Sequence, residues 1–268
     1  MDAASVLLLV LAALLGLAVG SFVNVVIWRV PRGESVVHPP SGCPRCGHPV
    51  RPRDNVPVLS WLLLRARCRD CGEPISGRYP LVEALTAALF VAVTARSLAM
   101  TDGLWALPAS LYLVSIGVAL AFIDLDTHRL PNAIVLPAYP VSLLLLGLAA
   151  AGTGDGPALL RAALGGAAMF LFYLVLVLVA PRSMGLGDVK LAGVLGLHLA
   201  FVGWGALAVG LFAAFVFGGV FGGALILLRR AGRKSAIPFG PWMIGGTGLA
   251  LVAGEEIAAG YLRMSGLA

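Results

Sequence analysis

The stretch SVLLLVLAALLGLAVGSFVNVVIW at residues 5–28 decides the fold, because no charged residue interrupts it before Arg29. A helix needs about 20 mostly apolar residues to cross a bilayer. The stretch is too long for the apolar part of a signal peptide, and it lacks a cleavage site of small residues. It therefore predicts a first membrane span that stays in the mature protein.

The rest of the 268-residue chain has the same character, with 59% hydrophobic and only 12% charged residues. A soluble domain has about 25% charged residues. We therefore expect an all-α polytopic membrane protein with about eight transmembrane helices, in contact with lipid. The expected spans are residues 5–28, 80–99, 105–123, 133–151, 158–180, 188–202, 204–228 and 237–259.

The basic residues are unevenly distributed between the two sides that alternating spans define. Sixteen of the 19 fall on one side, which the positive-inside rule assigns to the cytoplasm. They are the nine arginines of residues 29–79 together with Arg129, Arg182, Lys190, Arg229, Arg230, Arg233 and Lys234. This bias accounts for the net charge of +6, so we expect a multi-pass protein of the cytoplasmic (inner) membrane and no nucleic-acid partner.

Residues 29–79 form the only soluble insert that we expect, between the first two helices. The predicted organisation is a first transmembrane helix at 1–28, a cytoplasmic insert at 29–79 and a transmembrane domain at 80–268. An insert of this size buries little apolar core and needs a disulfide or a metal ion to hold it together.

Four cysteines, in the segments CPRCG and CRDCG, can hold the insert together through a metal ion or disulfides. Cys43 and Cys46 form the first C-x-x-C pair, and Cys68 and Cys71 form the second. This spacing is typical of a zinc ribbon, in which each pair presents two thiolates from one tight turn. A cytoplasmic insert disfavours disulfides. We therefore predict a structural Zn²⁺, with a redox dithiol as the alternative; the nearby His48 is not needed as a ligand.

Two aspartates stand at the cytoplasmic ends of predicted spans. Asp124 lies in FIDLDTHRLPN and Asp188 in GLGDVK, so the two side chains can face each other across a helix bundle. Ionisable residues at such positions are functional candidates. Two neighbouring carboxylates in a low dielectric do not both ionise easily. The ionised one can activate water while the neutral one donates a proton to a carbonyl oxygen, which is the chemistry of peptide hydrolysis.

Other candidates have equally good ordinary explanations. Gly185 and Gly187 leave the backbone before Asp188 open to an extended peptide, or only form the loop that enters a helix. Lys190 steadies a carboxylate or marks the positive side. Glu83, in the first turn of the second span, supports the site or interacts with the helix dipole and Arg78. Asp126 is a weaker candidate, because we expect it in a solvated loop.

These motifs resemble, in order and over most of the chain, those of the bacterial type IV prepilin peptidases, which are GxGD-type aspartic membrane proteases. The segments that carry the resemblance include GSFVNVVIWRVPRGES, SGCPRCGHPV, FIDLDTHRLP, GLGDVKLAG and IPFGPWM. The chain departs from the family at Asn132, where an aspartate is frequent, and at Ala66, where a glycine is frequent. Neither change affects Asp124 or the cysteine pairs.

The resemblance implies that the protein cleaves the basic leader from type IV prepilins or pseudopilins at the cytoplasmic membrane face. It implies that Asp124 and Asp188 are catalytic and that Cys43, Cys46, Cys68 and Cys71 bind zinc. It further implies that the protein N-methylates the new terminus with S-adenosylmethionine as the methyl donor, and that the insert is associated with this methylation. We also hypothesise that insert arginines contact an acidic residue of the mature pilin. The candidates are Arg45, Arg51, Arg53, Arg65, Arg67 and Arg69.

Three alternatives remain at this point. A peptidase without methyltransferase activity would retain the two aspartates and the leader-cleaving chemistry. A proton- or metal-coupled transporter would place carboxylates near the membrane midplane and show inverted repeats. The sequence has neither feature. A non-enzymatic scaffold would use the metal-binding insert for a partner and leave the aspartates solvated at helix ends.

Overall fold

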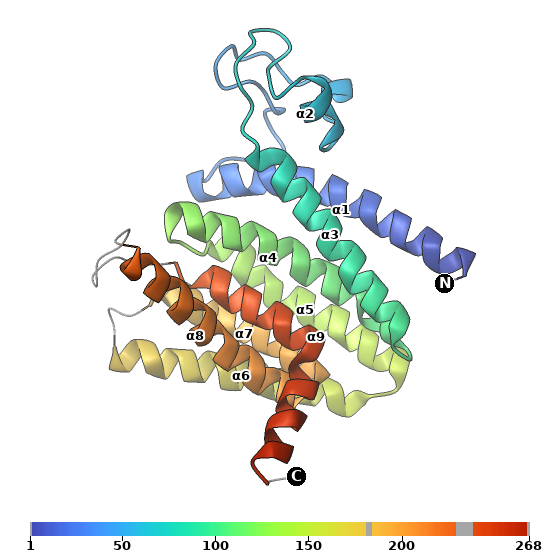
Figure 1. The fold of residues 1–268 in the computed structure, drawn as a ribbon, viewed down its shortest axis with the longest axis vertical. Coiled ribbons are helices and arrows are strands. Elements are labelled where there is room, and N and C mark those ends of the chain that lie inside the picture. The colour runs from blue at the N-terminus through green and yellow to red at the C-terminus, as the bar shows by residue number, and fades with distance from the viewer. Residues whose placement is uncertain (1, 181–183, 229–237, 267–268) are drawn as a thin grey trace. The chain divides into compact units, whose positions relative to one another are not determined.

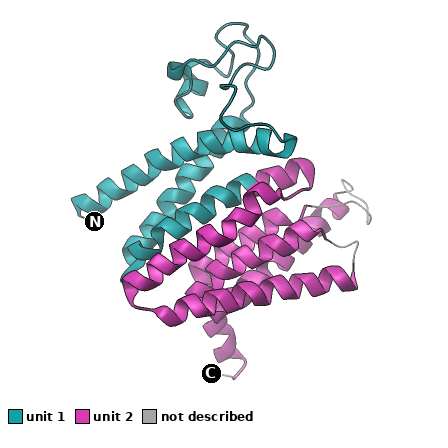
Figure 2. Ribbon diagram, turned by 180° about the vertical axis from the view of Figure 1, so that it is seen from behind, with its two compact units in different colours: residues 1–119 teal, residues 120–268 magenta. Residues whose placement is uncertain are grey.

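The computed structural model describes residues 2–180, 184–228 and 238–266. In these ranges the regular structure is helical apart from two isolated β-bridges, so the predicted all-α class is confirmed (Figure 1). The chain divides into two compact units, residues 1–119 and 120–268, whose boundary falls inside helix α4 (Leu107–Thr127) (Figure 2). The units are described separately below.

In the first unit, α1 (Ala3–Arg29) packs along α3 (Arg78–Ala99) through two glycines of α1. A Cβ on Gly16 would lie 2.6 Å from the Cα of Ala87, and one on Gly20 would lie 2.7 Å from the Cα of Glu83. The two backbones therefore touch, as small residues allow for helices in lipid. The 3₁₀ helix η3 (Gly103–Ala106) leads from α3 into α4.

The insert leaves α1 through η1 (Val30–Arg32) and returns at α3, and its middle forms η2 (Pro52–Asp54) and the short helix α2 (Leu59–Leu63). Its remaining residues form turns and irregular segments, as the ribbon between α1 and α3 shows (Figure 1), and they include the two isolated β-bridges. The expectation that this segment has little apolar core is met, because Ser60 is its one buried residue among those described.

In the second unit, the end of α4 is followed by α5 (Asn132–Thr153), α6 (Gly156–Val179), α7 (Leu186–Val202), α8 (Trp204–Leu227) and α9 (Gly240–Met264). Helix α7 packs against α5, α6, α8 and α9, and its residues 191–200 are all buried. Helix α7, which has Asp188 in its first turn, is therefore the central helix of this unit.

Glycines bring α6 and α7 into direct contact. A Cβ on Gly165 would lie 2.1 Å from the Cβ of Ala200, and one on Gly196 would lie 2.7 Å from the carbonyl oxygen of Gly165. The α8–α9 pair is similar, because a Cβ on Gly246 would lie 2.7 Å from the backbone nitrogen of Ala214. Close backbone approach at small residues thus contributes to the packing of both helix pairs.

Six helical segments are long and apolar enough to cross a membrane, within the part of the chain that the structure describes. They are Ala3–Arg32, Arg78–Ala99, Gly103–Thr127, Asn132–Thr153, Gly156–Val179 and Trp204–Leu227. The protein is thus a multi-pass membrane protein, but with two fewer such helices than the eight expected. Helix α7, the expected sixth span, has only 17 residues. Helix α9, the expected eighth, contains Glu255, Glu256 and Arg263 and several glycines, which lower its mean hydropathy.

Part of the charge pattern lies outside the described residues. Arg182, Arg229, Arg230, Arg233 and Lys234, which contribute to the expected cytoplasmic orientation, fall in residues 181–183 and 229–237. The orientation of the helices therefore stays a prediction from sequence.

Candidate functional site

Asp124 lies in the last turn of α4, and the first residue of α9 binds its carboxylate. The side chain is buried, and its Oδ2 accepts a hydrogen bond of 2.9 Å from the backbone N–H of Gly240. A Cβ on Gly240 would lie 2.8 Å from that oxygen, so this close approach requires glycine. The N-terminus of a helix carries partial positive charge, and α9 therefore favours the ionised form of Asp124.

Asp188 lies in the first turn of α7, as the sequence predicts. Its Oδ2 accepts a hydrogen bond of 3.0 Å from the backbone N–H of Gly185, and its own N–H donates to the carbonyl oxygen of Gly185 over 3.1 Å. This reciprocal pair resembles a capping box and fixes the side chain at the start of the helix. Asp188 is also buried, with 8% of its surface exposed.

The structure brings the two aspartates together within the second unit. Their carboxylates lie within electrostatic range of each other, and Leu130 packs close to both. A Cβ on Gly187, the residue before Asp188, would lie 3.0 Å from the Cβ of Leu130. A Cβ on Gly240, which binds Asp124, would lie 3.4 Å from Cδ2 of the same leucine. Because two adjacent buried carboxylates repel, one of them retains a proton more readily than the other.

The two glycines before Asp188 differ in their surroundings. Gly185 is exposed and uses its N–H to bind Asp188, whereas Leu130 covers the position where a side chain on Gly187 would be. Gly187 therefore has a packing reason to be glycine, in addition to the access for a peptide that the sequence suggests. Asp126 is exposed, but it lies in the last turn of α4 and not in the loop where the sequence places it.

Lys190 is directed towards α5. Its Nζ donates a hydrogen bond of 3.0 Å to Oδ1 of Asn132, and its carbonyl oxygen accepts one of 2.6 Å from the hydroxyl of Tyr139. A Cβ on Gly193 would lie 2.1 Å from that hydroxyl, so the last glycine of GLGDVKLAG makes room for Tyr139. Lys190 thus binds a side-chain amide, and its backbone contributes to the attachment of α7 to α5.

Glu83 belongs to the first unit, where it binds the insert. Helix α3 begins at Arg78, two residues before the expected start, so Glu83 lies in the second helical turn and not in the first. Pro80 is compatible with this earlier start, because the first turn needs no N–H from it. The Oε2 of Glu83 accepts a hydrogen bond of 2.7 Å from the backbone N–H of Val58, and Ser21 also bonds to the carboxylate.

The four cysteines of the insert form one cluster. The thiol groups of Cys43, Cys46, Cys68 and Cys71 all lie within 4.8 Å of one another, close enough to share a metal ion. The two C-x-x-C turns have the same geometry. In the first, Gly47 donates to the carbonyl of Cys43 with φ +72°. In the second, Gly72 donates to that of Cys68 with φ +74°. His48 is exposed, and the cluster among the described residues consists of the cysteines alone.

Backbone dipoles favour thiolate at one of these cysteines. The N–H groups of Cys46 and Arg45 lower the pKa of the Cys43 thiol to about 6. At Cys71 the N–H of Glu73 acts in the same direction, but desolvation and the neighbouring thiol groups outweigh it and raise the pKa. Four close thiols therefore resist losing all their protons together, and a bound cation would compensate the charge of the thiolates.

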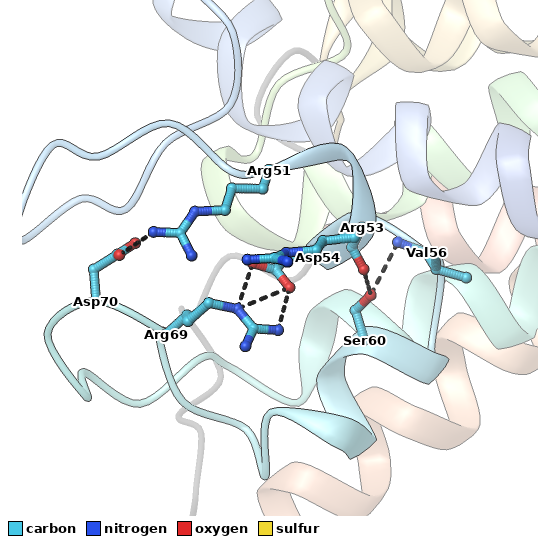
Figure 3. Close-up of polar contacts among 7 residues, drawn as sticks. All are labelled: Arg51, Arg53, Asp54, Val56, Ser60, Arg69 and Asp70. Atoms are coloured by element: carbon cyan, nitrogen blue, oxygen red, sulfur yellow. Dashed lines mark hydrogen bonds and ion pairs between the residues drawn. The ribbon is translucent and has the colours of Figure 1, made fainter.

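Ion pairs connect the two halves of the insert around this cluster. Arg51 pairs with Asp70 over 2.6 Å, and Arg69 makes a two-pronged contact with Asp54 (Figure 3). The guanidinium of Arg69 holds the pKa of Asp54 below its ordinary value. A further pair joins Arg45 to Glu73. Of the six arginines named above, these three are thus engaged within the insert.

Sequence reasoning missed the residues that surround the carboxylates. Gly240 belongs to the segment IPFGPWM, whose Phe-Gly-Pro indicates a helix start but gives no sign of contact with Asp124. Leu130, in the connection between α4 and α5, and the buried Tyr173 of α6 look like ordinary packing residues of a membrane protein. Only the packing of helices that are distant in sequence gives them a place at the site.

Comparison with known proteins identifies the family of the chain. Residues 14–97 match the bacterial peptidase A24 N-terminal domain, and residues 111–223 match the type IV leader peptidase family. The chain belongs to the type IV leader peptidase family. The resemblance that the sequence motifs indicate is thereby confirmed, and the matched region of the family includes both Asp124 and Asp188.

Curated relatives cover nearly the whole chain. The prepilin leader peptidase/N-methyltransferase of Aeromonas hydrophila is 39% identical over 277 residues, which are 94% of this chain and 93% of the relative. The protein of the same name from Pseudomonas aeruginosa is 35% identical over 281 residues, again 94% and 93%. That of Myxococcus xanthus is 44% identical over 82% of this chain and 63% of its own length. No solved structure matches the chain.

Proposed function

We propose that this protein is a prepilin leader peptidase that cleaves the basic leader of type IV prepilins or pseudopilins and then N-methylates the new N-terminus. The observation that carries the peptidase proposal is the pair of buried carboxylates, Asp124 and Asp188, which come from the ends of two different helices and lie within electrostatic range. Membership of the type IV leader peptidase family supports the choice of substrate.

The two aspartates hydrolyse the peptide without a covalent intermediate. The ionised carboxylate removes a proton from water, and the oxygen of that water forms a bond with the carbonyl carbon of the scissile peptide. The other carboxyl group donates its proton to the carbonyl oxygen. The C–N bond then breaks, and the leaving nitrogen takes up the proton that the first aspartate removed. One hydroxyl of the intermediate returns its proton to the second aspartate, which leaves a carboxylic acid and restores both side chains. Gly240 and Gly185 hold the two side chains in place through their N–H groups.

The second activity uses the amine that this cleavage releases. The methyl carbon passes from the sulfonium sulfur of S-adenosylmethionine to the free amine, which then loses a proton. We propose that the insert of residues 29–79 serves this step and that residues 80–268 carry the peptidase. The full-length relatives bear the double name peptidase/N-methyltransferase and support both activities.

The metal that fits the insert is Zn²⁺. Four thiol groups within 4.8 Å of one another can provide a tetrahedral set of sulfur ligands. Such a closed set leaves no position for a reacting water, so the ion would hold the two C-x-x-C turns together and take no part in the chemistry. Gly47 and Gly72 would shape the turns that present the ligands.

We propose that the insert and both aspartates face the cytoplasm in the inner membrane. Most basic residues of the chain lie in the segments on this side, as the positive-inside rule requires. A prepilin whose leader remains in the cytoplasm and whose apolar segment lies in the bilayer would present the bond between them at this level.

Mass spectrometry of a prepilin incubated with the purified protein and S-adenosylmethionine in detergent tests both activities. We expect Asp124→Asn and Asp188→Asn each to leave the leader attached, whereas Asp126→Asn, a change at an exposed acid two residues away, cleaves normally. Cleavage at the parent rate by either of the first two variants would refute the mechanism. Cys43→Ser should lose zinc and impair methylation more than cleavage, while His48→Ala should retain the metal.

A further inference from the structure

Tyr173 is a buried tyrosine of α6 to which the two-aspartate mechanism above assigns no role. Its side chain has no exposed surface. Three buried side-chain donors lack a hydrogen-bond partner within the described residues, and they are the hydroxyls of Thr94 and Tyr173 and the indole N–H of Trp242. A buried hydroxyl without a partner costs free energy, so its presence calls for an explanation.

The register of α6 against α7 places Tyr173 level with Asp188. Arg161 donates a hydrogen bond of 2.7 Å to the carbonyl oxygen of Ala200. One turn further along α6, the backbone of Gly165 contacts that of Gly196, one turn back along α7. The two helices are thus antiparallel, and each step of four residues along one matches four residues back along the other. Two more steps bring Tyr173 opposite Asp188.

The electrostatics agree with this register. The Tyr173 hydroxyl lies within range of the charge on Asp188, although the carboxylate oxygen Oδ2 of Asp188 already accepts from Gly185. Asp124 interacts with the same carboxylate. The free hydroxyl therefore belongs to the group of side chains around the two aspartates and not to a remote part of the helix bundle.

Aromatic contacts hold the ring of Tyr173 in place. The Tyr173 ring stacks on Phe215 of α8, with 5.7 Å between centroids and 15° between planes. It also lies 6.3 Å from the ring of Phe239, which immediately precedes Gly240 and in turn contacts Phe215 at 5.3 Å. The same cluster thus orients Tyr173 and holds the segment whose next N–H binds Asp124. A donor held in this way loses little conformational freedom when it binds a ligand.

We propose that the hydroxyl of Tyr173 is a catalytic hydrogen-bond donor of the peptidase site, directed at the carbonyl oxygen of the scissile peptide. This inference rests on the proposed function, in which that oxygen gains negative charge beside Asp188 as water attacks the carbonyl carbon. The hydroxyl donates a hydrogen bond and transfers no proton, so the two aspartates carry out the proton transfers unchanged. A fixed donor next to a developing oxyanion lowers the barrier in a site shielded from water. Both carboxylates are buried as well, with 4% of Asp124 and 8% of Asp188 exposed.

The test is Tyr173→Phe, which removes one oxygen and keeps the ring. We expect kcat for leader cleavage to fall by about 100-fold, with KM for the prepilin within a factor of about two. Methylation of a pilin that has already been cleaved should proceed at the parent rate. The thermal midpoint should stay the same or rise, because the variant removes an unpartnered polar atom. Tyr112→Phe is the matched control, at a half-buried tyrosine in the part of α4 that belongs to the first unit, and should cleave normally.

Two results would overturn the proposal. One is a Tyr173→Phe protein that cleaves within a factor of about two of the parent. The other is a loss of cleavage accompanied by an equal loss of methylation and a lower thermal midpoint, which identifies a structural hydroxyl. Asp188→Asn, measured in parallel, separates this failure from that of the proposed function. If Asp188→Asn is inactive while Tyr173→Phe is not, only the role of Tyr173 is refuted.

Discussion

The backbone N–H of Gly240 donates a hydrogen bond of 2.9 Å to Oδ2 of Asp124, which lies 116 residues earlier in the chain. Asp124 stands at the C-terminal end of α4, where the dipole of its own helix disfavours a negative charge. The N-terminus of α9 supplies the opposite end of a helix dipole at the same carboxylate. The start of α9 therefore compensates for the position of Asp124 in α4.

This contact predicts the effect of Gly240→Ala. The added Cβ would lie 2.8 Å from Oδ2 of Asp124 and 3.4 Å from Leu130, so the carboxylate, the helix start or both have to move. Because small misplacements of a catalytic group reduce the rate strongly, we expect kcat for leader cleavage to fall by about 100-fold. The rate is measured from the appearance of mature pilin by mass spectrometry.

Gly248→Ala provides the matched control on the same helix. No atom lies within 4 Å of the position of its Cβ, and alanine favours a helix over glycine, so this variant should be as stable as the parent and fully active. Equal cleavage rates for Gly240→Ala and Gly248→Ala would show that Asp124 does not depend on its contact with α9.

A second prediction concerns Gly193 and Tyr139, which attach α7 to α5. A Cβ on Gly193 would lie 2.1 Å from the Tyr139 hydroxyl and would break its bond to the carbonyl of Lys190. We expect Gly193→Ala to lower the free energy of unfolding by about 1–3 kcal/mol, as overpacking of a tight site does. Tyr139→Phe alone should lower it by about 1 kcal/mol, because it removes a single hydrogen bond.

The double variant distinguishes a direct clash from a general loss of helix packing. Once Tyr139→Phe has removed the hydroxyl, Gly193→Ala should cost less than it does in the parent, so the two losses are not additive. Denaturant unfolding in detergent measures the free energy of unfolding of the parent, the two single variants and the double variant. Gly219→Ala, at an open position of α8, is the control for the glycine-to-alanine change itself. Strictly additive losses would argue against contact between these two residues as the cause.

A third prediction concerns the attachment of the insert to α3. The buried carboxylate of Glu83 accepts the N–H of Val58, a β-branched residue with φ +61° in the left-handed region. Glu83→Ala removes the carboxylate that binds the N–H of Val58, so this N–H has no acceptor and nothing stabilises the strained backbone at Val58. We expect trypsin to cut the arginine-rich insert at least about fivefold faster in this variant, which corresponds to a loss of roughly 1 kcal/mol in local stability.

Glu83→Gln is the informative companion, because its amide oxygen can still accept the hydrogen bond of Val58. It should be cut at nearly the parent rate, and its methylation activity should be largely retained. If Glu83→Gln behaves like Glu83→Ala, the negative charge is needed and the hydrogen bond alone does not explain the role of this residue.

The parts of this structure that the sequence predicts are those determined by short segments. The long apolar stretches specify most of the helices, and Gly203 separates α7 from α8 where the break is expected. The two C-x-x-C turns bring their thiols together because each turn is local and both contain a glycine with positive φ. The number of membrane-crossing helices is harder to predict, because an apolar stretch such as α7 is equally suited to burial among other helices.

The surroundings of the aspartates depend instead on contacts between distant segments. No local pattern relates Gly240 to Asp124 or Tyr173 to Asp188, since the hydrogen bond of the first pair and the electrostatic proximity of the second both arise from the packing of one helix against another. Glu83 illustrates the same limit, because an acid near a helix start predicts an interaction with the helix dipole, whereas its partner is a backbone N–H from the insert. The chemistry of the site is thus predictable from the residue types, but the neighbours of each residue are not.

A final prediction concerns recognition of the acidic residue that we propose in the mature pilin. Arg45, Arg51 and Arg69 form ion pairs within the insert. Arg53, Arg65 and Arg67 are exposed and have no ion-pair partner in the described part of the chain. The second group is therefore free to bind a substrate carboxylate, and the first group is not.

We expect that charge reversal of at least one of Arg53, Arg65 and Arg67 raises KM for the prepilin, by about two- to fivefold for each position that contributes. This is the range for an exposed ion pair, and kcat should be unchanged. The effect should shrink at high salt, because exposed charges are screened. A prepilin with lysine in place of its acidic residue should recover the parent KM with the responsible variant. Arg45→Gln, which breaks an internal pair only, is the control, and unchanged KM values in all three charge-reversal variants would rule out recognition by these arginines.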